Sequence, residues 1–309
     1  MTAEPDDLHP EIRAFRDFIL GGYEGQGEAR DRDHRRQIAE AVRAPLQQGG
    51  PAMARTDHVT VAGRRLVIHR PVESEAALPV LVYLHGGGWV LFSIDTHDRL
   101  MREYAARSGF AVLGVDYSLS PEAAYPQALN DIDAAIDWLE RNGAAHGLDA
   151  SRWLIGGDSA GANLSLGTTL RRRDKGQSLP RGMVLNYGAF DDVRRESHDR
   201  FGDDRYMLTP EEMTEFWADY AQGRFDDPYV RPLLGDLKGL PPAHMAIAAC
   251  DILADENREI AARLAAAGVP TDVREYAGAS HSFLEASATS SIAREALDAA
   301  AAWMRTRVD

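Results

Sequence analysis

The sequence predicts an α/β fold, with a mostly parallel central sheet flanked by helices. Short apolar runs alternate with helix-like stretches from residue 79 onward, and repeated strand–helix units of this kind build a parallel sheet. The 309 residues, of which 44% are hydrophobic and 27% charged, have the composition of a folded chain and can bury a sizeable core. Ligands of such sheets bind beyond the carboxyl ends of the strands, so functional residues are expected there.

The N-terminal part precedes this alternation. Apolar residues recur there at helical spacing and predict an amphipathic helix, namely Leu8, Ile12, Phe15 and Ile19. Residues 30–44 predict a second helix that is densely charged on one side, and residues 47–51, with two glycines, predict a loop.

The sheet is predicted to begin with a hairpin around Ala62 and Gly63, which two short apolar strands flank. Later strands are predicted at residues 79–84, 110–115, 152–156, 183–187, 244–249 and 271–276, and helices at residues 96–107, 127–141, 160–173, 253–267 and 288–305. Residues 190–237 break the alternation because they are longer than an ordinary crossover. We expect this insertion to pack with the N-terminal helices as a cap.

Charge and cysteine content exclude several classes of function. Lys and Arg number 34 against 48 Asp and Glu, a net charge of −14, which disfavours nucleic acid and anionic membrane surfaces. The single cysteine, Cys250, excludes an intramolecular disulfide and a cysteine-based zinc or iron–sulfur site. The ten histidines show no metal-ligand spacing, so we expect neither a metal nor a cofactor.

The start of the chain is acidic and lacks a basic region followed by an apolar stretch, so we expect a cytoplasmic protein rather than an exported one. No run approaches the about 18 consecutive apolar residues of a membrane span, so no stable membrane insertion is expected. The sequence leaves a homodimer open.

The strongest chemical signal is the motif Gly157-Asp158-Ser159-Ala160-Gly161, which follows a predicted strand and opens a predicted helix. Small residues around the serine allow a sharp turn that holds its side chain above the sheet, over a helix N-terminus. A structural serine in a glycine-rich turn is the alternative. The strand–turn–helix context favours Ser159 as a nucleophile.

A second signal, His85-Gly86-Gly87-Gly88-Trp89, follows the strand predicted at residues 79–84. Consecutive glycines suit free backbone amides that point at an anion, such as a developing oxyanion. The absence of Lys-Ser/Thr after the glycines argues against a P-loop. We interpret His85 as a residue that organises this loop, because a base that precedes the nucleophile would break the expected chain order.

The third signal consists of His281, just past the last predicted strand, and Asp251, at the carboxyl end of the strand before it. The chain order is then Ser159, Asp251, His281, in which histidine accepts the serine proton and the carboxylate orients the imidazole. Asp255 competes for the acid role, but it falls inside a predicted helix, where it would be a first-turn acid. We therefore expect Asp251 to be the acid.

These motifs give the chain a family resemblance. It resembles, from about residue 80 to residue 284, the hormone-sensitive-lipase-like branch of the α/β-hydrolases, which includes bacterial carboxylesterases and lipases. The segment Asp116-Tyr117-Ser118-Leu119-Ser120-Pro121-Glu122 looks like the family's D-Y-R-L-A-P-E, and residues 251–256 look like its D-P-L-x-D-E. The resemblance implies an α/β-hydrolase fold, a triad of Ser159, Asp251 and His281, and an oxyanion hole from the amides of Gly87, Gly88 and Ala160, with His85 and Gly86 supporting the loop.

The chain departs from the family pattern at three positions, where Ile252, Ala162 and Ser282 replace Pro, Gly and Gly. Ser282 follows the predicted base and affects the pocket rather than the mechanism. The family's cap matches the two segments outside the sheet. The predicted organisation is therefore N-terminal cap helices at residues 1–50, a catalytic domain at residues 51–189 and 238–309, and a cap insertion at residues 190–237.

The resulting hypothesis is a serine carboxylesterase that hydrolyses short- to medium-chain acyl esters through an acyl-enzyme. An amidase or deacetylase with the same triad, and a ligand-binding protein on the same fold, are the alternatives. Trp89 and Phe92 are candidate pocket residues, although aromatic residues that follow an apolar strand more often serve packing. Residues 190–237 carry 13 acidic residues against 6 arginines, so the expected substrate is a small uncharged ester.

Overall fold

A computed structural model describes residues 7–308 of the chain. The first six positions of the predicted N-terminal segment, and residue 309, lie outside this range. The described strands are β1 (Arg55–Val61), β2 (Arg64–Arg70), β3 (Leu78–Leu84), β4 (Ala111–Val115), β5 (Leu148–Asp158), β6 (Met183–Asn186), β7 (Ala243–Cys250) and β8 (Thr271–Ser280).

The strands form one 8-stranded sheet in the order β1-β2-β4-β3-β5-β6-β7-β8. β2 pairs antiparallel with β1 and with β4, and every later pair is parallel. β3 and β4 are continuous apolar runs that are buried almost throughout, as parallel strands covered on both faces require. The predicted mostly parallel sheet and the hairpin at Ala62–Gly63 are confirmed.

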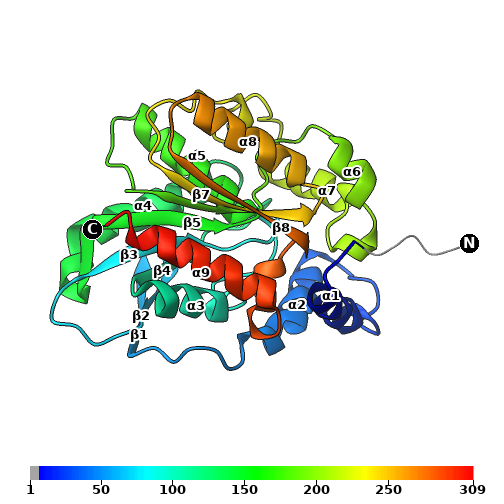
Figure 1. The fold of residues 1–309 in the computed structure, drawn as a ribbon, viewed down its shortest axis with the longest axis horizontal. Helices are drawn as coiled ribbons and strands as arrows, with labels where there is room; N and C mark the ends of the chain where they lie inside the picture. The colour runs from blue at the N-terminus through cyan, green and yellow to red at the C-terminus, as the bar shows by residue number, and fades with distance from the viewer. Residues whose placement is uncertain (1–6, 309) are drawn as a thin grey trace, which may run out of the picture.

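The helices are α1 (Pro10–Tyr23), α2 (Arg32–Arg43), α3 (Asp98–Ser108), α4 (Gln127–Asn142), α5 (Ala160–Asp174), α6 (Glu196–Phe201), α7 (Pro210–Ala221), α8 (Ala254–Ala266) and α9 (Ser291–Arg305). Short 3₁₀ helices are η1 (Ala44–Gln47), η2 (Gly143–His146), η3 (Asp204–Tyr206), η4 (Pro232–Leu234) and η5 (Phe283–Ala288). α3 and α9 cover one face of the sheet, while α4, α5 and α8 cover the other (Figure 1).

Most boundaries agree with the sequence prediction within two residues, and three differ by more: β8 ends at Ser280 rather than at residue 276, and β5 and the last helix begin elsewhere than predicted. β5 begins at Leu148 rather than at residue 152, because Leu148 pairs with Leu78 beyond an irregularity in the ladder. The last helix begins at Ser291 rather than at residue 288, because η5 occupies the preceding residues and the Ser290 side chain accepts a hydrogen bond from Ala293 N as its N-cap.

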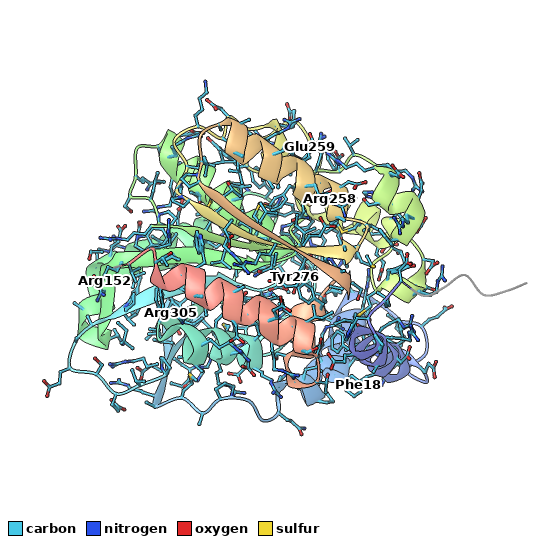
Figure 2. All side chains as sticks on the ribbon, viewed as in Figure 1. Phe18, Arg152, Arg258, Glu259, Tyr276 and Arg305 are labelled. Carbon is cyan, nitrogen blue, oxygen red and sulfur yellow. The ribbon has the colours of Figure 1, made fainter. Side chains whose placement is uncertain are left out.

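α1, α2, α6 and α7 lie together beyond the carboxyl ends of the strands (Figure 1). α7 begins with a capping box, in which Thr209 and Glu212 exchange backbone and side-chain hydrogen bonds. Side chains fill the layers between the sheet and the helices (Figure 2). Phe18 of α1, in contrast, faces outward and is 48% exposed. The helices that stand outside the sheet therefore cover the edge where a parallel sheet binds its ligands.

Candidate active site

Ser159 occupies the turn between β5 and α5 with φ 53° and ψ −119°. A non-glycine residue reaches this region only under strain, so the surroundings must hold it there. Gly157 and Gly161 allow the turn, because a Cβ on either would collide with the carbonyl oxygen of Leu84. The Ser159 amide donates to Asn186 O of β6 at 2.9 Å. The side chain therefore stands at the carboxyl edge of the sheet.

His281 and Asp251 meet Ser159 from the carboxyl ends of β8 and β7. His281 follows β8, and its Nε2 lies 2.9 Å from Ser159 Oγ. Its Nδ1 lies 2.7 Å from Asp251 Oδ2, and the other oxygen of Asp251 accepts from the Leu253 amide at 3.0 Å. All three side chains are buried. The arrangement is a hydroxyl, an imidazole and a carboxylate in series, the geometry that activates a serine.

The charge state of His281 is set by opposing effects. Burial lowers the pKa of the imidazole, and the Asp251 carboxylate, through its charge and hydrogen bond, raises it. Asp158 and Glu285 add further negative charge nearby, so the pKa of His281 is raised above 6.5 overall. The imidazolium that forms when His281 takes a proton is therefore stabilised in place.

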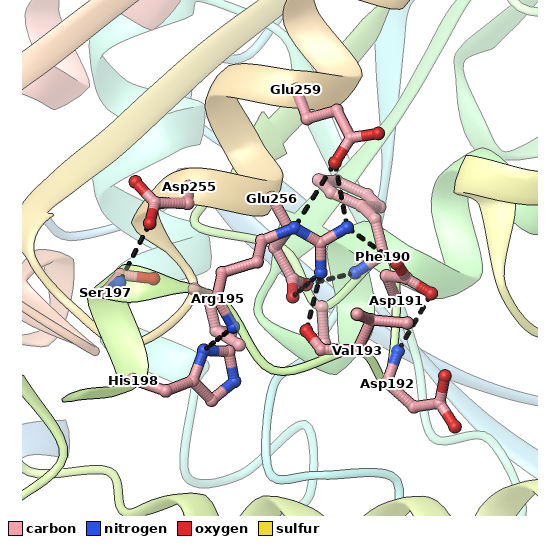
Figure 3. Close-up of polar contacts among 12 residues, drawn as sticks. Phe190, Asp191, Asp192, Val193, Arg195, Ser197, His198, Asp255, Glu256 and Glu259 are labelled. Carbon is pink, nitrogen blue, oxygen red and sulfur yellow. Dashed lines mark hydrogen bonds and ion pairs between the residues drawn. The ribbon is translucent and has the colours of Figure 1, made fainter.

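Asp255, the competing acid, points elsewhere. Its Oδ2 accepts from the Ser197 amide at 2.8 Å (Figure 3). Arg258 binds its other oxygen at 2.6 Å. Ser197 Oγ also donates to Ile252 O at 2.5 Å. Asp255 thus ties α6 to the loop that carries Asp251, whereas only Asp251 of the two contacts His281.

The loop after Asp251 is anchored further by a buried carboxyl. Glu256 is fully buried and accepts from the Phe190 amide at 2.6 Å, and burial raises its pKa well above the usual range. Arg195 lies 3.8 Å from Glu256 and binds Asp191 at 2.6 Å and Glu259 at 2.9 Å (Figure 3). The stem of the insertion is thereby fastened to α8, next to the acid loop.

The glycine loop borders the same site. Gly87 and Gly88 line a cavity together with Ser159 and His281, and their φ angles of 114° and 58° are accessible to glycine. A Cβ on Gly88 would collide with the Phe216 ring. Ala160 is buried at the first position of α5, directly after Ser159. The loop and the start of α5 thus flank the serine.

His85 makes its contacts with Gly86 of the glycine loop and with Tyr117 after β4. Burial and the neighbouring His97 lower its pKa to about 4, so the ring is neutral. Its Nδ1 donates to Gly86 O at 2.7 Å, and the ring stacks on Tyr117 with centroids 4.3 Å apart. His281, not His85, contacts Ser159. These contacts agree with the interpretation of His85 as a loop-organising residue.

Asp158 and His97 form a second buried acid–histidine pair that the sequence did not reveal. Asp158 accepts from the Tyr83 hydroxyl at 2.6 Å and lies 3.4 Å from His97 Nε2. A Cβ on Gly86 would approach Asp158 Oδ2 to 2.5 Å. The pair therefore underpins the glycine loop. Asp158 lies inside the motif at residues 157–161 that the sequence singled out, whereas no motif contains His97.

The cavity next to Ser159 has a volume of about 380 Å³. Apolar side chains from α1 and α7 dominate its wall, and Phe92, Arg43 and Ser282 also line it. Ser282 has a left-handed backbone, with φ 61°, where glycine would be unstrained. Trp89, predicted as a pocket residue, instead stacks on Tyr220 with centroids 4.4 Å apart and is 1% exposed. Its aromatic partners on α7 explain this burial.

Within residues 7–308, no group of three or more His, Cys, Asp or Glu side chains is arranged to hold a metal ion. No helix of that range has the length and apolar character needed to cross a membrane.

Comparisons with known proteins agree on one fold. A family model described as alpha/beta hydrolase fold matches residues 81–285. An acetyl esterase of Salmonella schwarzengrund (strain CVM19633) is 35% identical over 236 residues, which cover 74% of this chain and 72% of that protein.

Two solved structures cover nearly the whole chain. The hyperthermophilic esterase from the archaeon Pyrobaculum calidifontis superposes with a TM-score of 0.89 at 31% identity, over 97% of this chain and 98% of that one. The thermostable carboxylesterase EstE1, cloned from a metagenomic library, superposes with a TM-score of 0.86 at 33% identity, over 91% and 99%.

Proposed function

Because the chain belongs to the α/β-hydrolase fold family, in the hormone-sensitive-lipase-like branch that its motifs predict, we propose that it is a carboxylesterase acting through Ser159. The main support is the hydrogen-bonded series of Ser159, His281 and Asp251. His281 Nε2 lies 2.9 Å from Ser159 Oγ, and His281 Nδ1 lies 2.7 Å from Asp251 Oδ2. The similar acetyl esterase and the two similar esterase structures support ester hydrolysis as the reaction.

In the proposed reaction, Ser159 Oγ attacks the ester carbonyl carbon while His281 Nε2 takes its proton. The carbonyl oxygen becomes an oxyanion, which the amides of Gly87, Gly88 and Ala160 would bind. His281 then returns the proton to the leaving alcohol, and an acyl-enzyme remains. Water repeats the two steps, with its proton passing through His281, and releases the carboxylic acid.

α1, α2 and the insertion at residues 190–237 act as the proposed cap. Side chains of α1, α2 and α7 line the cavity, and Arg32 and Arg35 of α2 pair with Asp219 and Glu215 of α7. This cap would leave room for a small, mostly apolar ester, since concave sites of a few hundred Å³ bury most of such a ligand.

We expect the wild-type protein to hydrolyse p-nitrophenyl acetate and butyrate, and to lose activity on longer acyl chains. The cavity of about 380 Å³ is bounded by protein on the side of α7, so a long chain would meet its wall. A series of p-nitrophenyl esters from acetate to laurate measures this. Matched anilides in the same series distinguish an esterase from an amidase.

A second arm of the same experiment separates catalysis from binding. An organophosphate should label Ser159 with loss of activity, as detected by mass spectrometry. If esters were hydrolysed no faster than the uncatalysed rate and Ser159 stayed unlabelled, the proposal would be contradicted. The alternative of a ligand-binding protein would then remain. Esters of equal size with and without a negative charge test whether the acidic insertion disfavours anions.

Activity should fall on the acid side with a midpoint above pH 6.5. The reaction needs neutral His281 in the free enzyme, and the Asp251 carboxylate raises the pKa of that imidazole despite its burial. Protonation therefore removes the base as pH falls through the raised pKa. The measurement is kcat/KM for p-nitrophenyl butyrate between pH 5 and pH 9. A profile that stays flat down to pH 5 would argue against His281 as the base.

A further inference from the structure

Helix α2 sends arginine side chains onto the glycine loop, residues 86–92, rather than only onto the rest of the cap. Its sequence is Arg-rich, and its buried side chains include Arg43, which is 6% exposed. Arg36 and Arg43 each contact a different part of the loop. The charged face of this helix, which the sequence predicted, therefore contacts the glycine loop next to Ser159.

The glycine loop has a backbone that needs external support. Trp89 and Phe92 both have left-handed backbones, with φ 60° and 70°. A bulky residue in this conformation is strained and persists only where its surroundings determine it. Inside the loop, Gly87 O accepts from the amides of Val90 and Leu91 at 3.1 and 2.8 Å. Any relaxation of this turn would move the amides of the proposed oxyanion hole.

Arg36 supports the loop from the side of its carbonyl groups. Its Nε donates to Val90 O at 2.8 Å, and its Nη2 donates to Ser120 O at 3.0 Å and to Glu122 at 2.7 Å. The Ser120 amide in turn donates to Trp89 O at 2.9 Å. One guanidinium therefore joins the strained turn to the segment that follows β4.

Arg43 supports the loop at its other end. Its guanidinium carbon lies 4.2 Å from the centre of the Phe92 ring, and that ring packs so tightly on Gly87 that a Cβ there would come within 2.7 Å of it. Arg43 also donates to the Tyr23 hydroxyl at 3.0 Å and lies 3.3 Å from Glu285 of η5, which follows His281. A planar guanidinium group can stack on the Phe92 ring and pair with Glu285 at the same time.

We propose that α2 positions the oxyanion loop, with Arg36 and Arg43 as positioning residues for the hydrolysis, so that the N-terminal helices complete the reaction site as well as covering it. This inference rests on the proposed function. Neither arginine touches the reacting atoms. Both act by holding Gly87 and Gly88 in the geometry that a transition-state oxyanion requires, and a displacement of about 1 Å there is worth up to about 100-fold in rate.

The test compares Arg36→Met and Arg43→Met with Arg32→Met as the matched control. Arg32 lies on the same helix, is 40% exposed, and pairs with Asp219 at 3.2 Å and more distantly with Glu122 at 3.8 Å; among the described residues it has no hydrogen bond to the glycine loop. We expect each of the first two variants to lower kcat about 10- to 100-fold with KM within about threefold, because the loop acts on the transition state. Arg32→Met should stay within about threefold.

A transition-state probe separates positioning from general destabilisation. A trifluoromethyl ketone forms a tetrahedral oxyanion adduct with the serine, so its Ki should rise by the factor by which kcat falls. Arg43→Lys keeps a positive charge opposite Glu285, but an ammonium group cannot stack flat on the Phe92 ring. We therefore expect its kcat to stay close to that of Arg43→Met. All assays are run at 25 °C, below the melting temperature measured for each variant.

Three results would overturn the inference: kcat within threefold of wild type for both variants, a loss confined to KM, or an unchanged Ki for the ketone despite lower kcat. Full recovery of kcat by Arg43→Lys would overturn the positioning role given to the Arg43 stack on Phe92, because a positive charge opposite Glu285 would then suffice. An inactive wild type would instead contradict the proposed function, so the two failures are distinct.

Discussion

Replacement of Ser159 by alanine is expected to lower kcat for p-nitrophenyl acetate and butyrate by about 10⁶-fold, the effect of removing a serine nucleophile from a working triad. Ser159 Oγ is the atom within 2.9 Å of His281 Nε2, and alanine leaves no group there to form the acyl-enzyme. The substitution removes one buried hydroxyl, and an alanine Cβ already fits the turn. The variant should therefore fold with a melting temperature close to that of wild type.

Ser165→Ala is the matched control for this variant. Ser165 is buried on the same helix, α5, and its hydroxyl donates to Gly161 O at 2.7 Å within the helix. It should keep kcat within about threefold, since a single lost side-chain hydrogen bond costs only about 1 kcal/mol of stability. Retained turnover in Ser159→Ala, above the uncatalysed rate and free of contaminating esterase, would remove Ser159 from the mechanism.

Replacement of Asp251 by asparagine is expected to lower kcat about 10⁴-fold with little change in fold. The carboxylate accepts the Nδ1–H of His281 at 2.7 Å, which leaves Nε2 free to take the serine proton. An amide can present its N–H₂ to Nδ1 and so favour the opposite tautomer. It also removes the negative charge that raises the pKa of His281. The acid limb of the pH profile should therefore move to lower pH in the residual activity.

Asp255→Asn provides the comparison, because Asp255 is the acid that the sequence offered in competition. Its carboxylate binds the Ser197 amide and Arg258 rather than His281. An asparagine can still accept from the Ser197 amide, so kcat should fall by less than about tenfold. If Asp255→Asn were as inactive as Asp251→Asn, or if Asp251→Asn kept wild-type kcat, the assignment of Asp251 would be wrong.

Much of the fold followed from local pattern. The continuous apolar runs of β3 and β4 predicted buried parallel strands, and both lie in the middle of the sheet. The length of residues 190–237 predicted an insertion, and in the structure this segment contains α6 and α7. Boundaries were less accurate where a long-range contact decided them, as where Leu148 extends β5 by pairing with Leu78. Such a pair is invisible in a local window.

The candidate site divides in the same way. Ser159, Asp251 and His281 were predicted to meet because each lies at a strand end, and parallel strands bring their carboxyl ends together at one edge. Trp89 was expected in the pocket, yet it stacks on Tyr220 of α7. Its partner lies 131 positions away along the chain, and nothing near Trp89 in the sequence indicates it.

By itself, the sequence determined which groups do the proposed chemistry, because a sharp glycine-flanked turn, a glycine loop and strand-end acids and bases are properties of short segments. Only the tertiary structure decided what holds those groups in place. Asp158 and His97 beneath the glycine loop, Glu256 behind the acid loop and the α2 arginines on the loop backbone each act through contacts between distant segments. From sequence alone, a charged side chain is expected to be exposed to solvent. Whether it is buried or paired depends on which helix packs against it.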